Sequence, residues 1–277
     1  MAKVFISADI EGVSGISNKQ FTGPKCHGWD LGRSYMVEDV NAAIAGVLEA
    51  APGSEIVVRD AHGGSDNIVL EKLHPGTRLV AGWPHSFDML EGLDGSFDAC
   101  LFIGYHSRSL VPGGVLAHTF SRLVRKVTLS GREVGESGIN AFLAGGYGVP
   151  VAMISGDDKV AEEVAQLLPK TPVAVVKKGV ARECCEMPPL TESRELIRRT
   201  AAEAIKAVGG MEPLRLPDPL DFRVRLSYAE ALMGLAYLSD YDVVVRDSMI
   251  DVAIRGESPR EVFERFSVLL RLSFSED

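Results

Sequence analysis

The sequence predicts an α/β protein with a mostly parallel central sheet and helices on both of its faces. In the first half of the chain, short β-branched runs alternate with polar or glycine-rich loops and helical stretches. This alternation is typical of parallel sheets, whose crossover helices cover both faces. Of the 277 residues, 46% are hydrophobic and 24% are charged, which is typical of a folded globular chain and excludes a disordered one.

The predicted elements of this first unit follow the hydrophobic pattern. Residues 3–8 form a buried strand, and residues 35–50 form a helix whose apolar side chains recur at helical spacing until Pro52 and Gly53 end it. Further strands are expected at 55–59, 77–81, 99–104, 123–129 and 149–155. Further helices are expected at 137–147, where small residues suit close packing, and from Asp157, as a helix cap, to residue 168.

A smaller α+β unit is predicted in the last third of the chain. Gly209 and Gly210 end its first helix, and Ser258 followed by Pro259 is a typical start for its last helix. Its elements are a helix at 191–208, a strand at 222–226, a helical stretch at 228–235, strands at 242–246 and 252–255, and a final helix that ends near 272. We therefore expect a larger α/β domain at 1–189 and a smaller α+β domain at 190–277.

The charge balance excludes several classes of partner. A net charge of −9, with no more than two basic residues in a row, argues against binding to nucleic acid or anionic membranes, because both need clustered Lys and Arg. No window approaches the ~20 apolar residues of a membrane span, and the chain starts with no signal-peptide pattern. The four cysteines form no Cys-x-x-Cys pair and no disulfide framework. We therefore expect a cytoplasmic protein.

Acidic and histidine residues gather where predicted strands end. Such positions are held by Asp9 and Glu11, by Asp60 and His62, and by His106, while His118 follows a glycine-rich turn and Glu136 starts the helix of small residues. Because the carboxyl ends of parallel strands line one crevice, we expect these side chains to meet there. Mixed histidine and carboxylate ligands suit zinc or a similar first-row ion.

These side chains outnumber the ligands of a single tetrahedral zinc. Two ions about 3.5–4 Å apart, bridged by a carboxylate, would use them, and Asp9 is the natural bridge because it leaves the first strand directly. Each residue alone also has a plain structural interpretation, with Asp9 as a turn residue and Glu136 as part of a tight helix entry. Loop positions are expected for His27, His74 and His85, and a solvated basic face for Arg122, Arg125 and Lys126.

Five segments together resemble the D-aminopeptidases of the dipeptide-transport operon, the M55 peptidase family. They are SADIEGVSG at 7–15, RDAH at 59–62, GYH at 104–106, AH at 117–118 and VGESGINA at 134–141. The segments LHP at 73–75 and GDD at 156–158 are also similar to the family. The resemblance runs in order from residue 3 to about residue 160 and is weaker after residue 185.

The resemblance implies a dinuclear zinc exopeptidase that acts on short peptides with an N-terminal D-residue such as D-alanine. It implies two zinc ions per subunit, a catalytic role for His118, and metal ligands at Asp9, Glu11, His62, His106 and Glu136. It also implies a homodecamer, a ring of ten subunits whose sites face an inner chamber. Residues 1–189 would then be the metal-binding catalytic domain.

The mechanism that we expect is metal-assisted amide hydrolysis. In it, His118 acts as a proton shuttle that donates to the leaving amine, and a direct nucleophilic role for this histidine stays open. Asp60, two residues before His62, is a candidate to accept a hydrogen bond from the His62 ring and so to orient it.

Two alternatives stay open at this point. A dinuclear phosphoesterase would share the Asp and His ligands at strand ends, although the Gly-Asn-His and Gly-His-x-His segments of calcineurin-like enzymes are missing from the sequence. A non-catalytic, metal-stabilised oligomeric peptide-binding protein would have closed metal sites and no turnover. The sequence contains no P-loop, no Gly-x-Ser-x-Gly elbow and no His-Glu-x-x-His segment, which excludes the enzymes built on those motifs.

Overall fold

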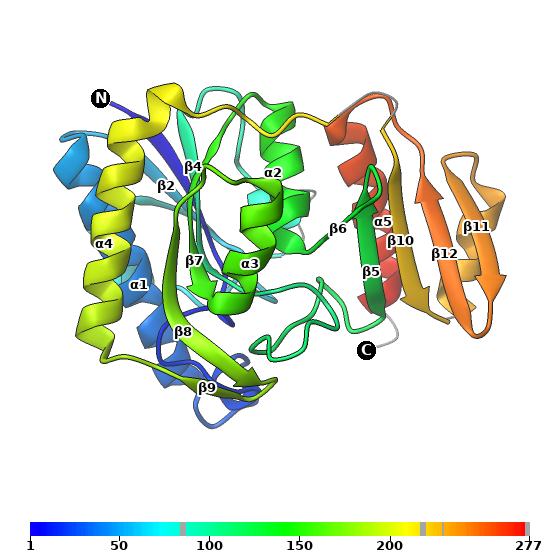
Figure 1. Cartoon of the computed structure of the whole chain (residues 1–277), viewed down its shortest axis with the longest axis horizontal. Helices are drawn as coiled ribbons and strands as arrows, with labels where there is room; N and C mark the ends of the chain where they lie inside the picture. Colours follow the sequence, from blue (N-terminus) through cyan, green and yellow to red (C-terminus); the bar gives the residue numbers. More distant parts are fainter. Residues whose placement is uncertain (84–86, 217–219, 229, 275–277) are drawn as a thin grey trace.

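A seven-stranded sheet forms the centre of the larger unit (Figure 1). The structure is a computed structural model that describes residues 1–83, 87–216, 220–228 and 230–274. In spatial order the strands are β3 (Arg78–Val80), β2 (Glu55–Asp60), β1 (Lys3–Ala8), β4 (Ala99–Tyr105), β7 (Val151–Asp157), β8 (Val173–Ala181) and β9 (Cys184–Glu186). All neighbours are parallel except β8 and β9, so the predicted fold class is confirmed.

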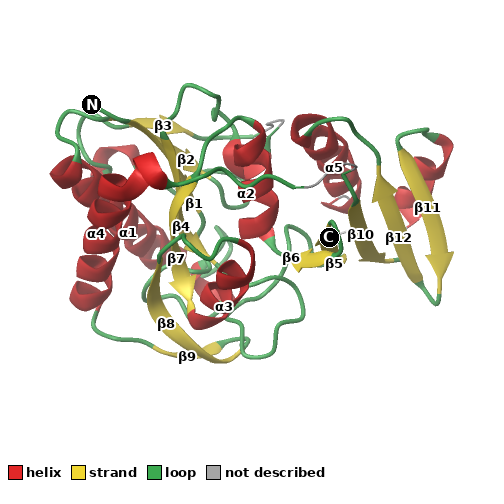
Figure 2. Ribbon diagram, turned by 45° about the horizontal axis from the view of Figure 1, so that its top comes forward, coloured by secondary structure: helices red, strands yellow, loops and turns green. Residues whose placement is uncertain are grey.

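Helices cover both faces of this sheet (Figures 1 and 2). One face carries α1 (Trp29–Ala50) and α4 (Leu190–Ala207), and the other carries α2 (Glu136–Gly146) and α3 (Asp158–Leu167). The two helices of the first pair approach closely at Gly46, where an added Cβ would lie 2.1 Å from the carbonyl oxygen of Arg198. Only glycine permits such a backbone approach.

An antiparallel five-stranded sheet forms the second unit. Its spatial order is β11 (Tyr241–Arg246), β12 (Met249–Ile254), β10 (Phe222–Ser227), β5 (Val124–Leu129) and β6 (Arg132–Val134). Helix α5 (Pro259–Phe274) packs between this sheet and α2 (Figure 2). Its Phe263 and Phe266 side chains are fully buried. Short 3-10 helices occur at Lys19–Phe21, Leu70–Lys72, Asp88–Leu90, Val208–Gly210 and Glu230–Tyr237.

The two packed units do not coincide with the two segments of sequence on either side of residue 190. Helix α4 lies at the start of the expected second domain, yet it packs on α1 and shares the core of the seven-stranded sheet. Strands β5 and β6 come from the first half of the chain, yet they complete the second sheet. The division at residue 190 stays a prediction, and the five-stranded sheet takes strands from both sides of it.

Several element predictions differ from the structure. Helix α1 begins at Trp29, before the periodic apolar pattern starts, and the stretch expected to be helical near 228–235 is a 3-10 helix. Strands β6, β8 and β9 were not predicted from the sequence. In β8 the pair Lys177–Lys178 interrupts the apolar run, and the fully buried Lys177 is not typical of a strand core. No helix in the described ranges combines the length and apolar character that crossing a membrane requires.

Candidate metal centre

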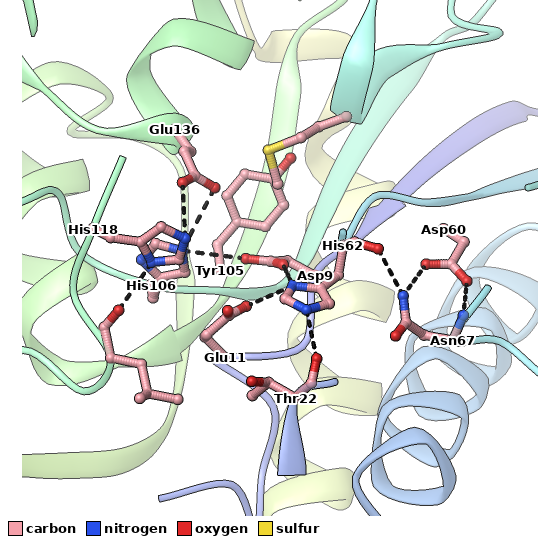
Figure 3. A network of polar contacts seen from close by, with 12 residues as sticks. Asp9, Glu11, Thr22, Asp60, His62, Asn67, Tyr105, His106, His118 and Glu136 are labelled. Atoms are coloured by element: carbon pink, nitrogen blue, oxygen red, sulfur yellow. Dashed lines mark hydrogen bonds and ion pairs between the residues drawn. The ribbon is translucent and has the colours of Figure 1, made fainter. Parts of the chain in front are cut away.

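The candidate metal centre lies at the carboxyl ends of three neighbouring strands. Ala8, the last residue of β1, pairs with Asp60 of β2 and with Ile103 of β4. The next residues along each strand therefore reach the same edge of the sheet. This edge brings together Asp9 and Glu11 from the first loop, His62 from the second and His106 from the third (Figure 3).

The loop that carries Asp9 and Glu11 is held by backbone contacts and by one buried lysine. Lys177 Nζ donates to three carbonyl oxygens of this loop, those of Glu11 (2.5 Å), Val13 (2.9 Å) and Ile16 (2.7 Å). Burial lowers the pKa of the Lys177 ammonium to about 8. Lys177 thus positions the loop, a role that the sequence analysis missed because its partners lie more than 160 positions away.

Asp9 faces both halves of the site with different oxygens. Its Oδ1 lies 3.3 Å from His62 Nδ1, and its Oδ2 lies 3.4 Å from His106 Nε2. Figure 3 shows Asp9 between these two rings. A carboxylate with one oxygen toward each group of ligands has the arrangement that a bridge between two metal ions needs.

The remaining side chains complete two groups around Asp9. Glu11 Oε2 lies 3.0 Å from His62 Nδ1, and Glu136 Oε2 lies 3.5 Å from His106 Nε2. Within each group the candidate ligand atoms lie within 4.8 Å of one another, and the groups are Asp9, Glu11 and His62, and His106, His118 and Glu136. The six candidate positions from the sequence therefore meet in one cluster.

Backbone carbonyls set the tautomer of each histidine. A nitrogen of each ring lies 2.7–2.9 Å from a carbonyl oxygen: His62 Nε2 from Thr22, His106 Nδ1 from Ser107, and His118 Nδ1 from Leu116. Because a carbonyl only accepts, the proton lies on that ring nitrogen. The opposite nitrogen of each ring faces the cluster. Neighbouring carboxylates outweigh burial and raise the pKa of His62 and His106 well above its usual value, so a metal ion bound there would displace a proton from that nitrogen.

Three buried atoms of the cluster make no hydrogen bond among the described residues. They are Asp9 Oδ2, Glu11 Oε2 and His106 Nε2. An unpaired polar atom away from water is unfavourable, and all three of these atoms can donate an electron pair. The donor set of carboxylate oxygens and imidazole nitrogens fits zinc.

The pKa values in the cluster reflect burial together with the charges of neighbouring carboxylates and histidines. Burial raises the pKa of Asp9 to about 7, and the charge of Glu11 adds to the rise. Burial alone would raise the pKa of Glu11 and Glu136, but the neighbouring histidines outweigh it and lower both values. A bound cation would take the place of the protons that this cluster otherwise shares.

His118 differs from the other two histidines. Its side chain is 23% exposed, against 1% for His106, and its Nε2 lies 3.8 Å from Glu136 Oε1. Burial lowers the pKa of His118, and the adjacent His106 lowers it further. Its ring is therefore neutral near pH 7 and can accept a proton.

Asp60 does not orient the His62 ring, so this prediction from the sequence is wrong. Its carboxylate accepts from Asn67 N (2.6 Å), Asn67 Nδ2 (2.9 Å) and Ile68 N (2.7 Å). Asn67 Nδ2 also donates to the His62 carbonyl oxygen at 2.7 Å, so Asp60 shapes the loop rather than the ring (Figure 3). Spacing alone could not show that the Asp60 carboxylate accepts from the backbone of Asn67 and Ile68 instead of from the His62 ring.

The other sequence candidates lie outside the cluster. His27 is exposed, His74 Nδ1 contacts the carbonyl of Pro75, and His85 falls outside the described residues. Asp157 caps α3, as predicted, by accepting from Val160 N at 2.8 Å. Its second oxygen accepts from Val115 N at 2.8 Å, in the loop that leads to His118.

A carboxylate that the sequence analysis missed lies beside the cluster. Asp88 lines a cavity of about 140 Å³ together with Asp9, His62, His118 and Glu136. Burial raises the pKa of Asp88 to about 7, and the charge of Glu136 adds to the rise. No strand end or motif marks residue 88, so only the tertiary structure brings it to the site.

The basic cluster expected as a solvated face is divided by the structure. Lys126 forms a surface ion pair with Glu133. Arg122 and Arg125 instead line a larger cavity, of about 780 Å³, which also contains Glu11 and His118 in its walls. His118 and Phe120 line both this cavity and the smaller one, so the two spaces adjoin at the candidate centre.

Three comparisons with known proteins agree with this geometry. A model of the M55 peptidase family, described as D-aminopeptidase, matches residues 2–268. The chain is 36% identical to a D-aminopeptidase of Bacillus subtilis (strain 168) over 216 residues, which cover 78% of each chain. It also superposes with a TM-score of 0.91, at 30% identity and over 98% of each chain, on a structure titled Zn-dependent D-aminopeptidase DppA from Bacillus subtilis, a self-compartmentalizing protease.

Proposed function

The chain belongs to the M55 D-aminopeptidase family, and from this premise we propose that it is a zinc-dependent aminopeptidase for short peptides with an N-terminal D-residue such as D-alanine. The observation that carries the proposal is the cluster at the carboxyl edge of the sheet. It joins three carboxylates and three histidines from separate loops around unpaired, electron-donating atoms. Such a site on this sheet edge is typical of a hydrolytic metal centre.

We propose two zinc ions per subunit, bridged by Asp9. Glu11 and His62 would complete one site, and His106 and Glu136 the other. The two oxygens of Asp9, directed at different histidines, support the bridge. In this set His118 is not a zinc ligand. Its greater exposure and its position in the walls of both cavities support this assignment.

Zinc in such a site polarises the scissile carbonyl and lowers the pKa of a bound water. The protein supplies proton transfer through His118. Its Nδ1–H is held by the Leu116 carbonyl, so its Nε2 is the atom that takes up and releases a proton. Because its pKa is lowered, the ring starts neutral, accepts a proton during attack and passes it to the leaving amine.

Asp88 is suited to bind the free amine of the substrate. An exopeptidase must recognise the N-terminal ammonium, and Asp88 is a carboxylate in the wall of the smaller cavity that is not one of the proposed zinc ligands. Burial raises the pKa of Asp88 in the absence of a ligand. An ammonium group beside Asp88 would favour its ionised form. The N-terminus of the peptide would then lie in the smaller cavity.

We also propose a closed homo-oligomer, and ten subunits as the family resemblance implies. The similar structure from Bacillus subtilis carries the description self-compartmentalizing, which requires several copies. The outer part of the second unit exposes apolar side chains that an interface would cover, namely Tyr237, Leu238, Val244 and Val245. The four free cysteines support a reducing compartment, the cytoplasm.

Metal analysis combined with matched peptides tests the function. We expect two equivalents of zinc per chain, and faster hydrolysis of D-Ala-D-Ala than of L-Ala-L-Ala, with loss of activity on removal of zinc by a chelator. Hydrolysis of p-nitrophenyl phosphate without hydrolysis of any peptide would support a phosphoesterase instead. Bound metal with no turnover of either substrate would support the binding protein.

A further inference from the structure

The larger cavity beside the candidate centre has the opposite charge to the chain as a whole. The protein carries 38 acidic and 29 basic residues. The charged residues that line the cavity are Lys19, Arg122, Arg125 and Arg182 on the basic side, and Glu11 and Glu183 on the acidic side. Glu11 is a proposed metal ligand, so the wall available to a ligand is strongly cationic. A surface of this kind attracts an anion.

A β-bulge at Arg125 interrupts the regular alternation of side chains along β5. On β5, Val124 pairs with Leu226 and Lys126 pairs with Arg225, so Arg125 is the extra residue of a β-bulge. Bulges redirect side chains, and they are frequent next to active sites. Lys126, its neighbour, contacts Glu133 at the surface, whereas Arg125 lines the cavity.

The Arg125 guanidinium contains a buried donor without an acceptor. Its Nε makes no hydrogen bond within the part of the chain that the structure describes, and its exposed surface is below 1 Å². A buried N–H that lacks an acceptor is unfavourable. A carboxylate is the ligand that best matches a guanidinium, since its two oxygens accept two parallel N–H bonds.

The same cavity reaches the proposed catalytic histidine. His118 lies in its wall, and the loop before His118 is held by Arg182, whose side chain donates to the Ala117 carbonyl and whose own carbonyl accepts from Leu116 N at 2.7 Å. The cationic wall and the proton shuttle therefore belong to one continuous space. A ligand that spans this space would place an anionic end at Arg125 and its middle at the candidate centre.

We propose that Arg125, with Arg122 at the rim, binds the free C-terminal carboxylate of the peptide substrate. This inference rests on the proposed function and specifies its substrate class, which is short peptides with a free acid end. With the ammonium end at Asp88 and the carboxylate end at Arg125, both termini are recognised across the candidate centre. Because each added residue moves the carboxylate by about 3.5 Å, this contact also selects peptide length.

Paired substrates and one substitution test the inference. The zinc-loaded enzyme would be assayed with D-Ala-D-Ala and with its C-terminal amide, which differ only in the charge of the carboxyl end. For the wild type we expect kcat/KM to be about 10- to 100-fold higher for the acid, mainly through KM. Arg125→Met should remove this preference by lowering kcat/KM for the acid and leaving the amide unchanged. Arg125→Lys should restore part of it.

Lys126→Met is the matched control, because it removes a positive charge from the next residue of the same strand outside the cavity. It should keep the acid preference of the wild type. Equal kcat/KM for acid and amide in the wild type would overturn the carboxylate site while leaving the peptidase function intact. An equal loss on both substrates in Arg125→Met would make Arg125 structural and would also overturn it.

Calorimetry separates this inference from the proposed function. His118→Ala, loaded with zinc, should bind D-Ala-D-Ala more tightly than its amide, and adding Arg125→Met should abolish the difference. If the wild type hydrolyses no peptide but the His118→Ala variant shows this difference in binding, the carboxylate site stands and the peptidase function fails. If the variant binds acid and amide equally, the carboxylate site is refuted whatever the activity.

Discussion

The imidazole rings of His106 and His118 are stacked, with 4.2 Å between their centroids and 11° between their planes (Figure 3). The two rings share Glu136 as a neighbour, at 3.5 Å and 3.8 Å. Their surroundings differ, because His106 is closed off from solvent and His118 lines both cavities. Two histidines so close together can thus have different roles, one holding metal and the other moving protons.

The first prediction separates these roles. His118→Ala should keep its zinc and its fold and lose turnover by about 10²- to 10⁴-fold, the usual contribution of general acid–base catalysis. His106→Ala should lose zinc and turnover together. Metal content by mass spectrometry and kcat, measured on the same samples, make the comparison. His74→Ala, outside the cluster, is the control, and parallel loss of zinc in His118→Ala would make His118 a ligand.

The second prediction concerns the bridge. Asp9→Ala should lower zinc from two equivalents per chain to almost none, because its two oxygens face different ligand groups. Glu11→Ala, which removes a member of one group only, should leave about one equivalent. Asp66→Ala, an exposed control, should leave the content unchanged. A full zinc content in Asp9→Ala would show that the bridge is assigned wrongly.

The third prediction concerns recognition of the amine. Asp88→Asn should raise KM for D-Ala-D-Ala by about 10-fold or more, since it removes a charged acceptor, and should leave zinc content unchanged. Asn suits the backbone here, because residue 88 has a φ of 49° and Asn tolerates that region. Asp94→Asn is the control for a nearby exposed carboxylate. An unchanged KM in Asp88→Asn would contradict the role.

The fourth prediction concerns pH and a carboxylate away from the site. Asp39 of α1 is fully buried, accepts from Ser14 N (2.8 Å) and Oγ (2.6 Å), and has a pKa that burial raises from 3.8 to about 6. The folded protein therefore holds this proton more tightly than the unfolded chain. Its contribution to the unfolding free energy is complete below pH 3.8 and is lost as the pH rises through 6.

Compared with Asp39→Asn, the metal-free wild type should lose roughly 2 kcal/mol of unfolding free energy between pH 4 and pH 7, at about 1.4 kcal/mol per pKa unit. Urea unfolding of both proteins across this range measures the difference. Glu38→Gln, at the exposed neighbouring position, should remain parallel to the wild type. A constant difference between wild type and Asp39→Asn would show that the pKa of Asp39 is not raised.

Local patterns in the sequence were enough to predict the central sheet and the place of the site. Apolar runs of strand length identified β1, β2, β4 and β7. The acids and histidines of the first loops follow the ends of these strands within a few residues. Carboxyl ends of parallel strands share one edge, so Asp9, Glu11, His62 and His106 could be expected to meet without knowledge of any contact. The same pattern and the family segments both indicated His118 and Glu136, whose positions depend on a longer loop and on the β5–β6 hairpin.

Only the tertiary structure decided the features that join distant segments. Lys177 reaches the loop of Glu11 across 166 positions, Asp88 lies in a short 3-10 helix, and a bulge against a strand a hundred residues away directs Arg125. Helix α4 packs with the first sheet although it follows the expected boundary. Side-chain periodicity predicts which face of an element is buried, but not which distant element covers it, because that choice depends on the packing of the whole chain.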